Sequence, residues 1–329
     1  MYLFTWKVAP ALAAGNCVVA KPSEVTPMTA FLLSTCIEAA GFPPGVFNVV
    51  HGLGPEAGEA IVTHKDIKAL SFTGGTATGA HIQRATAGSF KKLSLELGGK
   101  NAAVVFADAD LDQALQTTIR SSFANQGQIC LCSSRILIER SVYASFRDRL
   151  VEKAKRMVPG DPLRPETKMG AVVSEGHRDK IMGAIEQAVA DGGKVLAGGS
   201  LAAAPNERCA GGYFVQPTII EGVPELCDLN QQEVFGPVIS LMPFDTEEEA
   251  LSLANSTAYG LSATLWTQNL QRAHRVAAKM DTGIVWVNCW LVRDLRTPFG
   301  GVKSSGVGRE GGFEALRFFT EPQNVCVQL

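Results

Sequence analysis

The stretch Phe72-Thr73-Gly74-Gly75-Thr76-Ala77-Thr78-Gly79 joins a predicted strand, residues 67–72, to a predicted helix, residues 76–87. Upstream, the same order of strand, turn and helix occurs twice, with predicted strands at residues 16–20 and 46–50. Short β-branched runs that alternate with helical stretches are typical of a mostly parallel α/β sheet. Residues 1–98 are therefore predicted to form part of a doubly wound nucleotide-binding domain, which normally has more strands.

A second α/β region is predicted downstream, over residues 99–318. Its first elements are a strand at 104–106, a helix at 110–124 and a strand at 136–139. A long amphipathic helix is expected over residues 142–157, with Ser141 as its N-terminal cap. The last residues alternate between apolar and polar from Asn324 to Leu329, which predicts an edge strand in a tail that spans residues 319–329.

Composition narrows the class of protein. With 46% hydrophobic and 19% charged residues in 329, the chain is able to build a sizeable core. Thirty Lys and Arg against 32 Asp and Glu leave no basic excess for nucleic acid. No apolar stretch approaches the length of a membrane span. The eight cysteines are irregularly spaced, which favours thiols in the cytoplasm over a disulfide framework or a structural metal site.

Two glycine turns are candidates for binding phosphate. The first, residues 51–58 (HGLGPEAG), follows a strand, but its spacing is one residue too long for a dinucleotide fingerprint. The second is the stretch at 72–79, where backbone N–H groups at a helix start attract phosphate and small residues allow close approach. For both, the alternative is an ordinary turn between a strand and a helix.

Two further residues are candidates for chemistry. Glu96 lies among leucines, where desolvation raises a carboxyl pKa and suits a general base. The alternative is an acid at a strand end that pairs with Lys100. Cys130 follows a Gly- and Gln-containing loop, where nearby amides favour a thiolate. The alternative for Cys130 is a buried, inert thiol.

Taken together, these segments resemble the aldehyde dehydrogenase superfamily. The strongest matches are LELGGK at 95–100 and FANQGQICLCSSR at 123–135. Further matches follow in family order along the chain: APALAAGN (9–16), KPSE (21–24), FTG (72–74), EVFGP (233–237), PFGG (298–301) and SGVGRE (305–310). The resemblance implies an aldehyde dehydrogenase-like α/β fold with an incomplete NAD-binding domain, a catalytic domain and a C-terminal oligomerisation strand.

The resemblance also implies roles for individual residues. Cys130 matches the nucleophile that forms a thiohemiacetal and then a thioester, and Glu96 matches the base that activates the hydrolytic water. Cys132 matches a position with no catalytic role. No metal site is implied. The residues that match cofactor-binding positions for NAD are Lys21, Glu24, Thr73, Gly74, Gly75, Gly79, Glu233 and Phe235. The family usually has Ser at the position of Gly75. A carboxylate at Glu24 favours NAD over NADP.

The expected substrate is a small aldehyde that carries a carboxylate. The pattern WLVRDL at 290–295 resembles 2-aminomuconic and 2-hydroxymuconic semialdehyde dehydrogenases, which act in degradation of tryptophan metabolites and aromatic rings. Arg293 is expected to clamp the substrate carboxylate, and Phe299 to line the pocket. The alternative for Arg293 is a surface ion pair with Asp294. The amino and hydroxy substrates stay equally open.

Three hypotheses about the function follow from the resemblance. The leading one is an NAD-dependent semialdehyde dehydrogenase that works as a homo-oligomer, either a dimer or a tetramer. The second is a general or betaine-aldehyde dehydrogenase. The third is an inactive subunit, because family members carry well over a hundred residues before the position of Met1. These residues include the asparagine that helps bind the oxyanion. The chain is therefore expected to be an N-terminally truncated member of the family.

Overall fold

The computed structural model describes all residues from 1 to 329, and its contacts divide the chain into two compact units. Unit 1 comprises residues 1–97, 293–300 and 306–329, and unit 2 comprises residues 98–292 and 301–305. The first boundary lies one residue before the expected one. Residues 293–300 and 306–318, which were expected in the catalytic domain, belong to unit 1. The prediction divided the sequence into consecutive segments, and such a division misses a chain that returns to its first unit.

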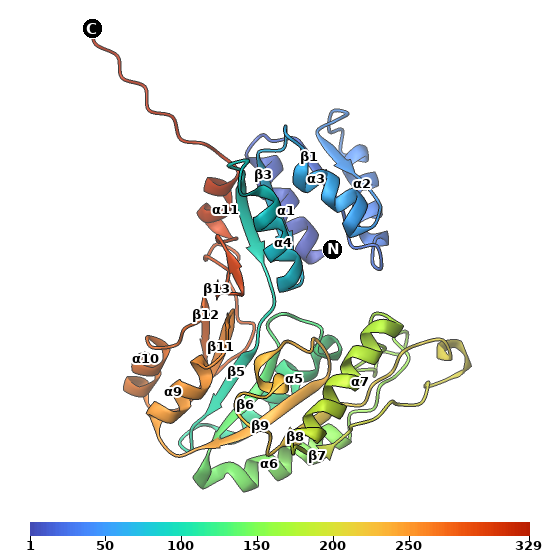
Figure 1. Cartoon of the computed structure of the whole chain (residues 1–329), viewed down its shortest axis with the longest axis vertical. Helices are drawn as coiled ribbons and strands as arrows, with labels where there is room; N and C mark the ends of the chain where they lie inside the picture. Colours follow the sequence, from blue (N-terminus) through green and yellow to red (C-terminus); the bar gives the residue numbers. More distant parts are fainter. The chain divides into compact units, whose positions relative to one another are not determined.

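Unit 1 contains two small sheets and the helices that surround them (Figure 1). One sheet is the parallel pair β1–β2, and the other has the order β14–β4–β3. The elements are α1 (Tyr2–Ala13), β1 (Val18–Ala20), α2 (Met28–Ala39), β2 (Phe47–Val49), η1 (Gly54–Gly58), α3 (Glu59–Thr63), β3 (Ala69–Thr73), α4 (Thr76–Thr86), β4 (Lys92–Glu96), β14 (Gly306–Val307) and α11 (Gly312–Phe318).

The strands of the first ninety residues do not form one continuous sheet. Strands β2 and β3 lie in different sheets, so the expected consecutive βαβαβ pairing is interrupted between them. Apolar patterning defines where a strand runs but not which neighbour it pairs with. The small core of unit 1 gathers on the second sheet, around Val62, Leu70, Ile82, Leu95 and Leu97.

Unit 2 is built on a seven-stranded sheet with the order β12–β11–β5–β6–β9–β8–β7, in which only the β7–β8 pair is antiparallel. Its strands are β5 (Asn101–Val105), β6 (Ser133–Glu139), β7 (Lys194–Ala197), β8 (Thr218–Glu221), β9 (Val238–Phe244), β11 (Ser262–Trp266) and β12 (Ile284–Val287). A separate antiparallel pair joins β10 (Tyr259–Gly260) to β13 (Val302–Lys303).

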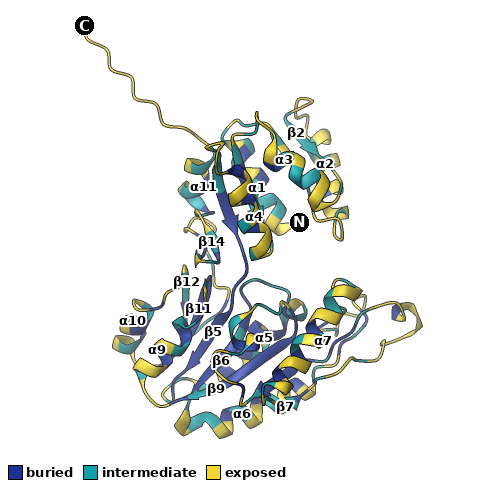
Figure 2. Ribbon diagram, in the orientation of Figure 1, coloured by how far each residue is buried: buried dark blue, intermediate teal, exposed yellow.

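Helices cover both faces of this sheet. Along β5, Ala103 and Val105 pack into one core with α5 (Leu111–Phe123) and α6 (Arg140–Lys155). Ala102 and Val104 pack into another core with α9 (Glu247–Asn255) and α10 (Leu270–Ala277). The central strands are accordingly mostly buried, and the helices expose their outer faces (Figure 2). The helical elements are α5 (Leu111–Phe123), η2 (Ala124–Gly127), α6 (Arg140–Lys155), α7 (Glu175–Ala190), η3 (Glu207–Cys209), α8 (Asp228–Gln231), α9 (Glu247–Asn255) and α10 (Leu270–Ala277). No helix combines the length and the apolar composition needed to cross a bilayer.

Two local predictions differ from the structure. Helix α6 begins at Arg140, before the expected cap Ser141, whose hydroxyl instead donates to the Glu139 carboxylate at 3.1 Å. Residues 319–329 contain no strand, and their apolar side chains at Val325 and Val327 are exposed. An edge strand needs a neighbour to hydrogen-bond with, and the single chain supplies none to this tail.

Candidate active site

Cys130 lies in a tight turn of unit 2, between η2 and β6. The Cys132 N–H donates to the Ile129 carbonyl at 2.9 Å, which makes Cys130 the second residue of a hydrogen-bonded β-turn. Cys130 is half-buried and Cys132 is buried. Burial raises the pKa of Cys132 to about 12, so this thiol stays protonated at neutral pH. Since the thiolate is the nucleophile, Cys132 is unsuited to that role.

The segment before this turn has an unusual backbone. Asn125, Gln126 and Gly127 have φ values of 49°, 58° and 70°, three left-handed residues in succession. Non-glycine residues adopt this conformation at a cost, so neighbouring contacts must hold it. The Gln126 side chain does so, because its Oε1 accepts from the Gly170 N–H and its Nε2 donates to the Ala171 carbonyl, each at 3.0 Å.

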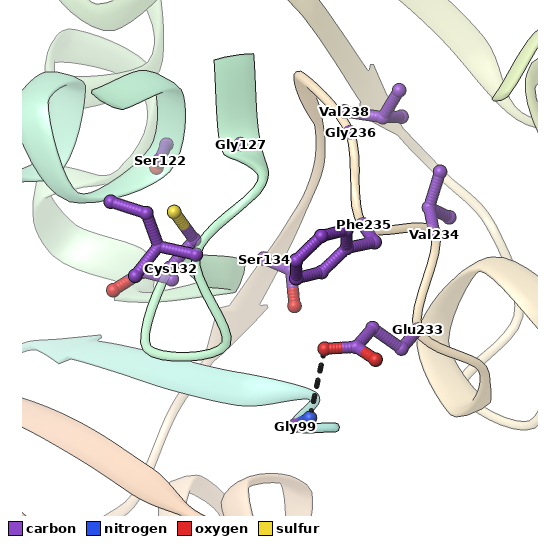
Figure 3. Close-up of a pocket in the computed structure, with 12 residues that line it drawn as sticks. Gly99, Ser122, Gly127, Cys132, Ser134, Glu233, Val234, Phe235, Gly236 and Val238 are labelled. Carbon is purple, nitrogen blue, oxygen red and sulfur yellow. Dashed lines mark hydrogen bonds between the residues drawn. The ribbon is translucent and has the colours of Figure 1, made fainter. Parts of the chain in front are cut away.

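Glu233 and Phe235 line a small cavity of unit 2 (Figure 3). The Gly99 N–H donates to Glu233 Oε1 at 3.0 Å, as the dashed line in the figure shows. A Cβ atom on Gly98 would lie 2.1 Å from Glu233 Oε2, which explains the need for glycine before Gly99. Burial raises the pKa of Glu233, and the Gly99 hydrogen bond and Lys100 oppose that rise. Cys132 also lines this cavity, whereas Cys130 does not.

Glu96 is the last residue of β4 in unit 1, and only 4% of it is exposed. Burial raises its pKa to about 8, and repulsion from Glu310 contributes in the same direction. The charges of Lys7, Arg309 and Arg293 oppose this rise. Its Oε1 is buried without a hydrogen-bond partner, and a Cβ atom on Gly300 would lie 2.7 Å from it. A carboxyl with a pKa near 8 is suited to proton abstraction at neutral pH.

Two residues near Glu96 were not picked out as candidates from the sequence. Lys7 of α1 forms an ion pair with Glu310 and donates to the Ser71 hydroxyl at 3.0 Å. Glu310 appeared within the matched motif SGVGRE, but the sequence alone gave no reason to connect it with Lys7, which is 303 residues away. Tertiary folding brings both charges to Glu96.

The turn at residues 73–79 joins β3 to α4 in unit 1. Gly75 precedes the helix, and a Cβ atom there would meet nothing within 4 Å. The hydroxyl oxygens of Thr73 and Thr76 are buried without hydrogen-bond partners. Space above the turn, two unused hydroxyls and the first N–H groups of α4 fit the phosphates of a dinucleotide. Gly79 packs closely on Leu97, where a Cβ atom would be 2.6 Å from the leucine Cδ atoms.

Lys21 and Glu24 follow β1. The Lys21 ammonium donates to the carbonyls of Pro22 and Gly52, at 2.7 and 3.1 Å, and pairs with Glu24 at 3.3 Å. Local hydrogen bonds hold the pKa of Glu24 below its usual value, with the backbone as the largest cause. Glu24 is therefore an exposed anion at neutral pH. Through the Gly52 carbonyl, the turn at 51–58 thus helps to hold the Lys21 side chain in place.

Arg293 lies among aromatic rings of unit 1. Its guanidinium carbon is 3.8 Å from the centre of the Trp6 ring, 3.9 Å from that of Phe299 and 5.7 Å from that of Tyr2. The Asp294 carboxylate is engaged by Arg296. Arg293 thus stacks on aromatic rings, and the neighbouring Asp294 pairs with another arginine. Stacking of this kind holds the plane of the guanidinium, whose N–H edge is matched to carboxylates.

The candidate residues therefore fall into two groups. Unit 2 holds Cys130, Glu233 and Phe235. Unit 1 holds Lys21, Glu24, Thr73, Gly74, Gly75, Gly79, Glu96, Arg293 and Phe299. The structure contains no group of three or more His, Cys, Asp or Glu side chains arranged to hold a metal ion.

The family model described as "Aldehyde dehydrogenase family" matches residues 1–325. A 2-aminomuconic semialdehyde dehydrogenase of Danio rerio is 54% identical over 330 residues, an alignment that covers 100% of this chain and 68% of that protein. A 2-hydroxymuconic semialdehyde dehydrogenase of Pseudomonas putida is 51% identical, with the same two coverages.

Solved structures agree in fold. PnpE from Pseudomonas sp. WBC-3 superposes with a TM-score of 0.93 at 44% identity, over 97% of this chain and 65% of that one. Betaine aldehyde dehydrogenase from Staphylococcus aureus, solved in complex with NAD⁺, gives a TM-score of 0.92 at 38% identity, over 98% and 65%. The chain thus spans about two thirds of the length of these relatives, and the fold expected from the sequence is confirmed.

Proposed function

Because the chain belongs to the aldehyde dehydrogenase family, we propose that it oxidises an aldehyde to a carboxylic acid with Cys130 as nucleophile. The Cys130 sulfur adds to the aldehyde carbon, and the thiol proton ends on the aldehyde oxygen. Loss of a hydride, which NAD⁺ would accept, and of the hydroxyl proton to solvent converts the thiohemiacetal into a thioester. Water then hydrolyses the thioester, which releases the acid and restores the thiol. The match along residues 1–325 carries this proposal, and the turn at Cys130 and the buried Glu96 support it.

Glu96 is proposed as the base for the hydrolytic step. With a pKa near 8, its carboxyl is partly ionised at neutral pH and takes a proton from water as the water attacks the thioester. The charge of Lys7 favours the ionised form of Glu96, but repulsion from its ion-pair partner Glu310 is the larger effect. Together with burial, this repulsion keeps the pKa of Glu96 high enough for the carboxyl to take up a proton near neutral pH.

NAD is proposed as the hydride acceptor, and it supplies the oxidising equivalent when bound. The turn at residues 73–79 would hold the pyrophosphate, Lys21 and Glu24 the adenosine ribose, and Glu233 and Phe235 the nicotinamide end. The anionic Glu24 accepts hydrogen bonds from ribose hydroxyls and repels a 2′-phosphate, which favours NAD over NADP. Gly75 offers no side-chain hydroxyl to the phosphates, but Thr73 and Thr76 supply two.

The proposed substrate is a semialdehyde that bears a carboxylate, of the 2-aminomuconic or 2-hydroxymuconic type named for the relatives. Arg293 would bind the carboxylate through its N–H edge, with Phe299 and Trp6 as the walls. A betaine aldehyde is disfavoured by the same geometry, because the rings suited to a quaternary ammonium already stack on a guanidinium.

Turnover of semialdehyde acids and plain aldehydes by the purified chain, followed as NADH absorbance, tests this proposal. Arg293→Ala is expected to lower the ratio of kcat/KM for the acid to that for the plain aldehyde by about 10²-fold, the loss of a bidentate charged contact. Arg296→Ala is the matched control, since Arg296 is exposed and pairs with Asp294. An unchanged ratio in Arg293→Ala rejects the clamp. Absence of NADH formation with every aldehyde favours an inactive subunit instead.

We further propose a cytoplasmic homo-oligomer. None of the eight cysteines is in a disulfide, which fits a reducing compartment. The apolar side chains of the tail, Val325, Val327 and Leu329, are exposed in the single chain. An exposed apolar segment of this kind gains hydrogen bonds and burial if it pairs as a strand with a sheet edge of a second copy. Light scattering of a chain shortened to residue 321 tests this, with a smaller assembly as the expected result.

A further inference from the structure

Three consecutive backbone carbonyls at the proposed nucleophile accept hydrogen bonds from two buried side chains. Asn101 Nδ2 donates to the Cys130 carbonyl at 2.7 Å and to the Cys132 carbonyl at 2.9 Å. Trp290 Nε1 donates to the Leu131 carbonyl at 3.0 Å. Asn101 is 4% exposed and Trp290 is 3% exposed, so water cannot readily replace either donor.

Both donors are themselves held in place. Asn101 begins β5, and its Oδ1 accepts from the Ser262 N–H at the start of β11 at 3.0 Å. The guanidinium carbon of Arg120, in α5, lies 5.5 Å from the centre of the Trp290 ring. The same guanidinium donates to the Trp290 carbonyl at 3.1 Å. The central sheet and α5 thus fix the donors.

These bonds determine how the peptide groups around Cys130 are turned. In a trans peptide the N–H points opposite to the carbonyl. Fixing the Cys130 carbonyl on Asn101 therefore turns the Leu131 N–H away from Asn101. Fixing the Leu131 carbonyl on Trp290 turns the Cys132 N–H toward the Ile129 carbonyl, the bond that closes the turn. That last bond in turn orients the peptide that carries the Cys130 N–H.

We propose that Asn101 and Trp290 are positioning residues that set the reactivity of the Cys130 thiol by orienting the peptide groups around it. Neither touches a reacting atom. Amide N–H groups directed at a sulfur stabilise its thiolate, and peptides that turn freely do so less well. The inference rests on the proposed role of Cys130 as nucleophile, but its direct test measures the thiol and not turnover.

The test is site-resolved alkylation of the full chain by iodoacetamide, read by peptide mass spectrometry. Asn101→Ala removes the donor to two carbonyls, and Trp290→Phe removes the indole N–H but keeps an aromatic ring. Asn230→Ala and Trp286→Phe are the matched controls. Asn230 is also buried and donates to a carbonyl, that of Pro224, and Trp286 Nε1 donates to the Val292 carbonyl at 2.9 Å.

Two other cysteines serve as internal references. Cys36 is exposed on α2 and reports reagent and conditions, and Cys209 is buried and reports unfolding. In both test variants the alkylation rate of Cys130, relative to that of Cys36, is expected to fall about three- to tenfold. This is the change in rate that corresponds to the net free energy of one hydrogen bond. The pH profile of Cys130 alkylation is expected to move to higher pH, and Cys209 is expected to stay protected.

An unchanged or increased relative rate at Cys130 in the test variants overturns the proposal. An equal fall of the Cys130 rate in the control variants also overturns it, as does a fall that is accompanied by alkylation of Cys209. Either result would mean that the substitutions act by destabilising the whole fold. The outcome is separable from the proposed function. If Cys130→Ser still forms NADH, the nucleophile assignment fails whatever the alkylation rates are, and if the chain is inactive, the alkylation result still decides the role of Asn101 and Trp290.

Discussion

Glu96 is an acid whose surroundings favour its protonated form. If it is the hydrolytic base, turnover of the wild-type chain rises with pH through about 8, because only the ionised carboxyl takes a proton from water. Glu96→Gln is expected to lower turnover about 10²–10⁴-fold while the first, thioester-forming step still releases one equivalent of NADH. Stopped-flow absorbance separates the burst from the steady state.

A matched control and a contrary result accompany that prediction. Glu314→Gln alters a carboxylate of α11 that pairs with Arg317 at the surface, and its turnover should match that of the wild type. A steady state in Glu96→Gln that keeps the wild-type rate and pH profile would rule out Glu96 as the base.

At the residue scale, the buried amine of Lys100 is expected to make the stability of the chain depend on pH. Burial, and after it repulsion from Arg135, lowers the pKa of the Lys100 amine to about 7. The Lys100 Nζ has no hydrogen-bond partner. An unfolded lysine has a pKa near 10.4, so between about pH 7 and 10 the unfolded chain binds the extra proton. The folded state is therefore penalised most below about pH 7, and the penalty fades as pH rises.

Lys100→Met is accordingly expected to raise the free energy of unfolding, on the order of a few kcal/mol at pH 6 and less at pH 10. Denaturant titrations at both pH values measure this difference. Lys65→Met, at an exposed lysine, should show little change at either pH. An equal gain at both pH values for Lys100→Met would mean that packing, not charge, is responsible.

At the scale of elements, the link from α5 through η2 to the Cys130 turn depends on Gly127. Its φ is 70°, and an added Cβ would lie 2.1 Å from the Gly236 carbonyl oxygen. Gly127→Ala is therefore expected to destabilise the chain by about 2–4 kcal/mol, from backbone strain and displacement of the segment at Gly236. Thermal unfolding measures the loss.

Gly183→Ala provides the comparison, because Gly183 lies inside helix α7 with nothing within 4 Å of an added Cβ. It should stabilise the chain by about 0.5–1 kcal/mol. If both variants shift stability in the same direction, the left-handed turn at Gly127 is not under the constraint described.

Helix boundaries show how far local signals reach. The Ser174 hydroxyl caps α7 by accepting from the His177 N–H, and the Thr246 hydroxyl caps α9 by accepting from the Glu249 N–H. Ser141 is also a serine expected to cap a helix, yet helix α6 begins one residue before it, at Arg140. A cap residue is a local preference, and packing of α6 in the sheet core decides where the helix starts.

At the scale of the whole molecule, the two units differ in how much they bury. Every residue of β5 is buried in the central sheet of unit 2, whereas β1 and β2 of unit 1 form an isolated pair without a buried residue. Isolated two-stranded sheets are marginal in water. Hydrogen exchange is therefore expected to be orders of magnitude slower in β5 than in β1. Equal protection in both would show that the pair is stabilised in a way the single chain does not reveal.

The sequence by itself determined the fold class, because apolar periodicity and glycine turns report local geometry. It also singled out Glu96, Cys130 and the glycine turn at 72–79, since these chemistries need particular residue types at short spacing. Only the tertiary structure brought Lys7 and Glu310 to Glu96 and stacked Arg293 on Trp6 and Phe299. It also brought Asn101 and Trp290 to the Cys130 turn, where they donate hydrogen bonds to three carbonyls. Those contacts join residues up to 303 positions apart, and no local preference encodes which distant side chains packing will bring together.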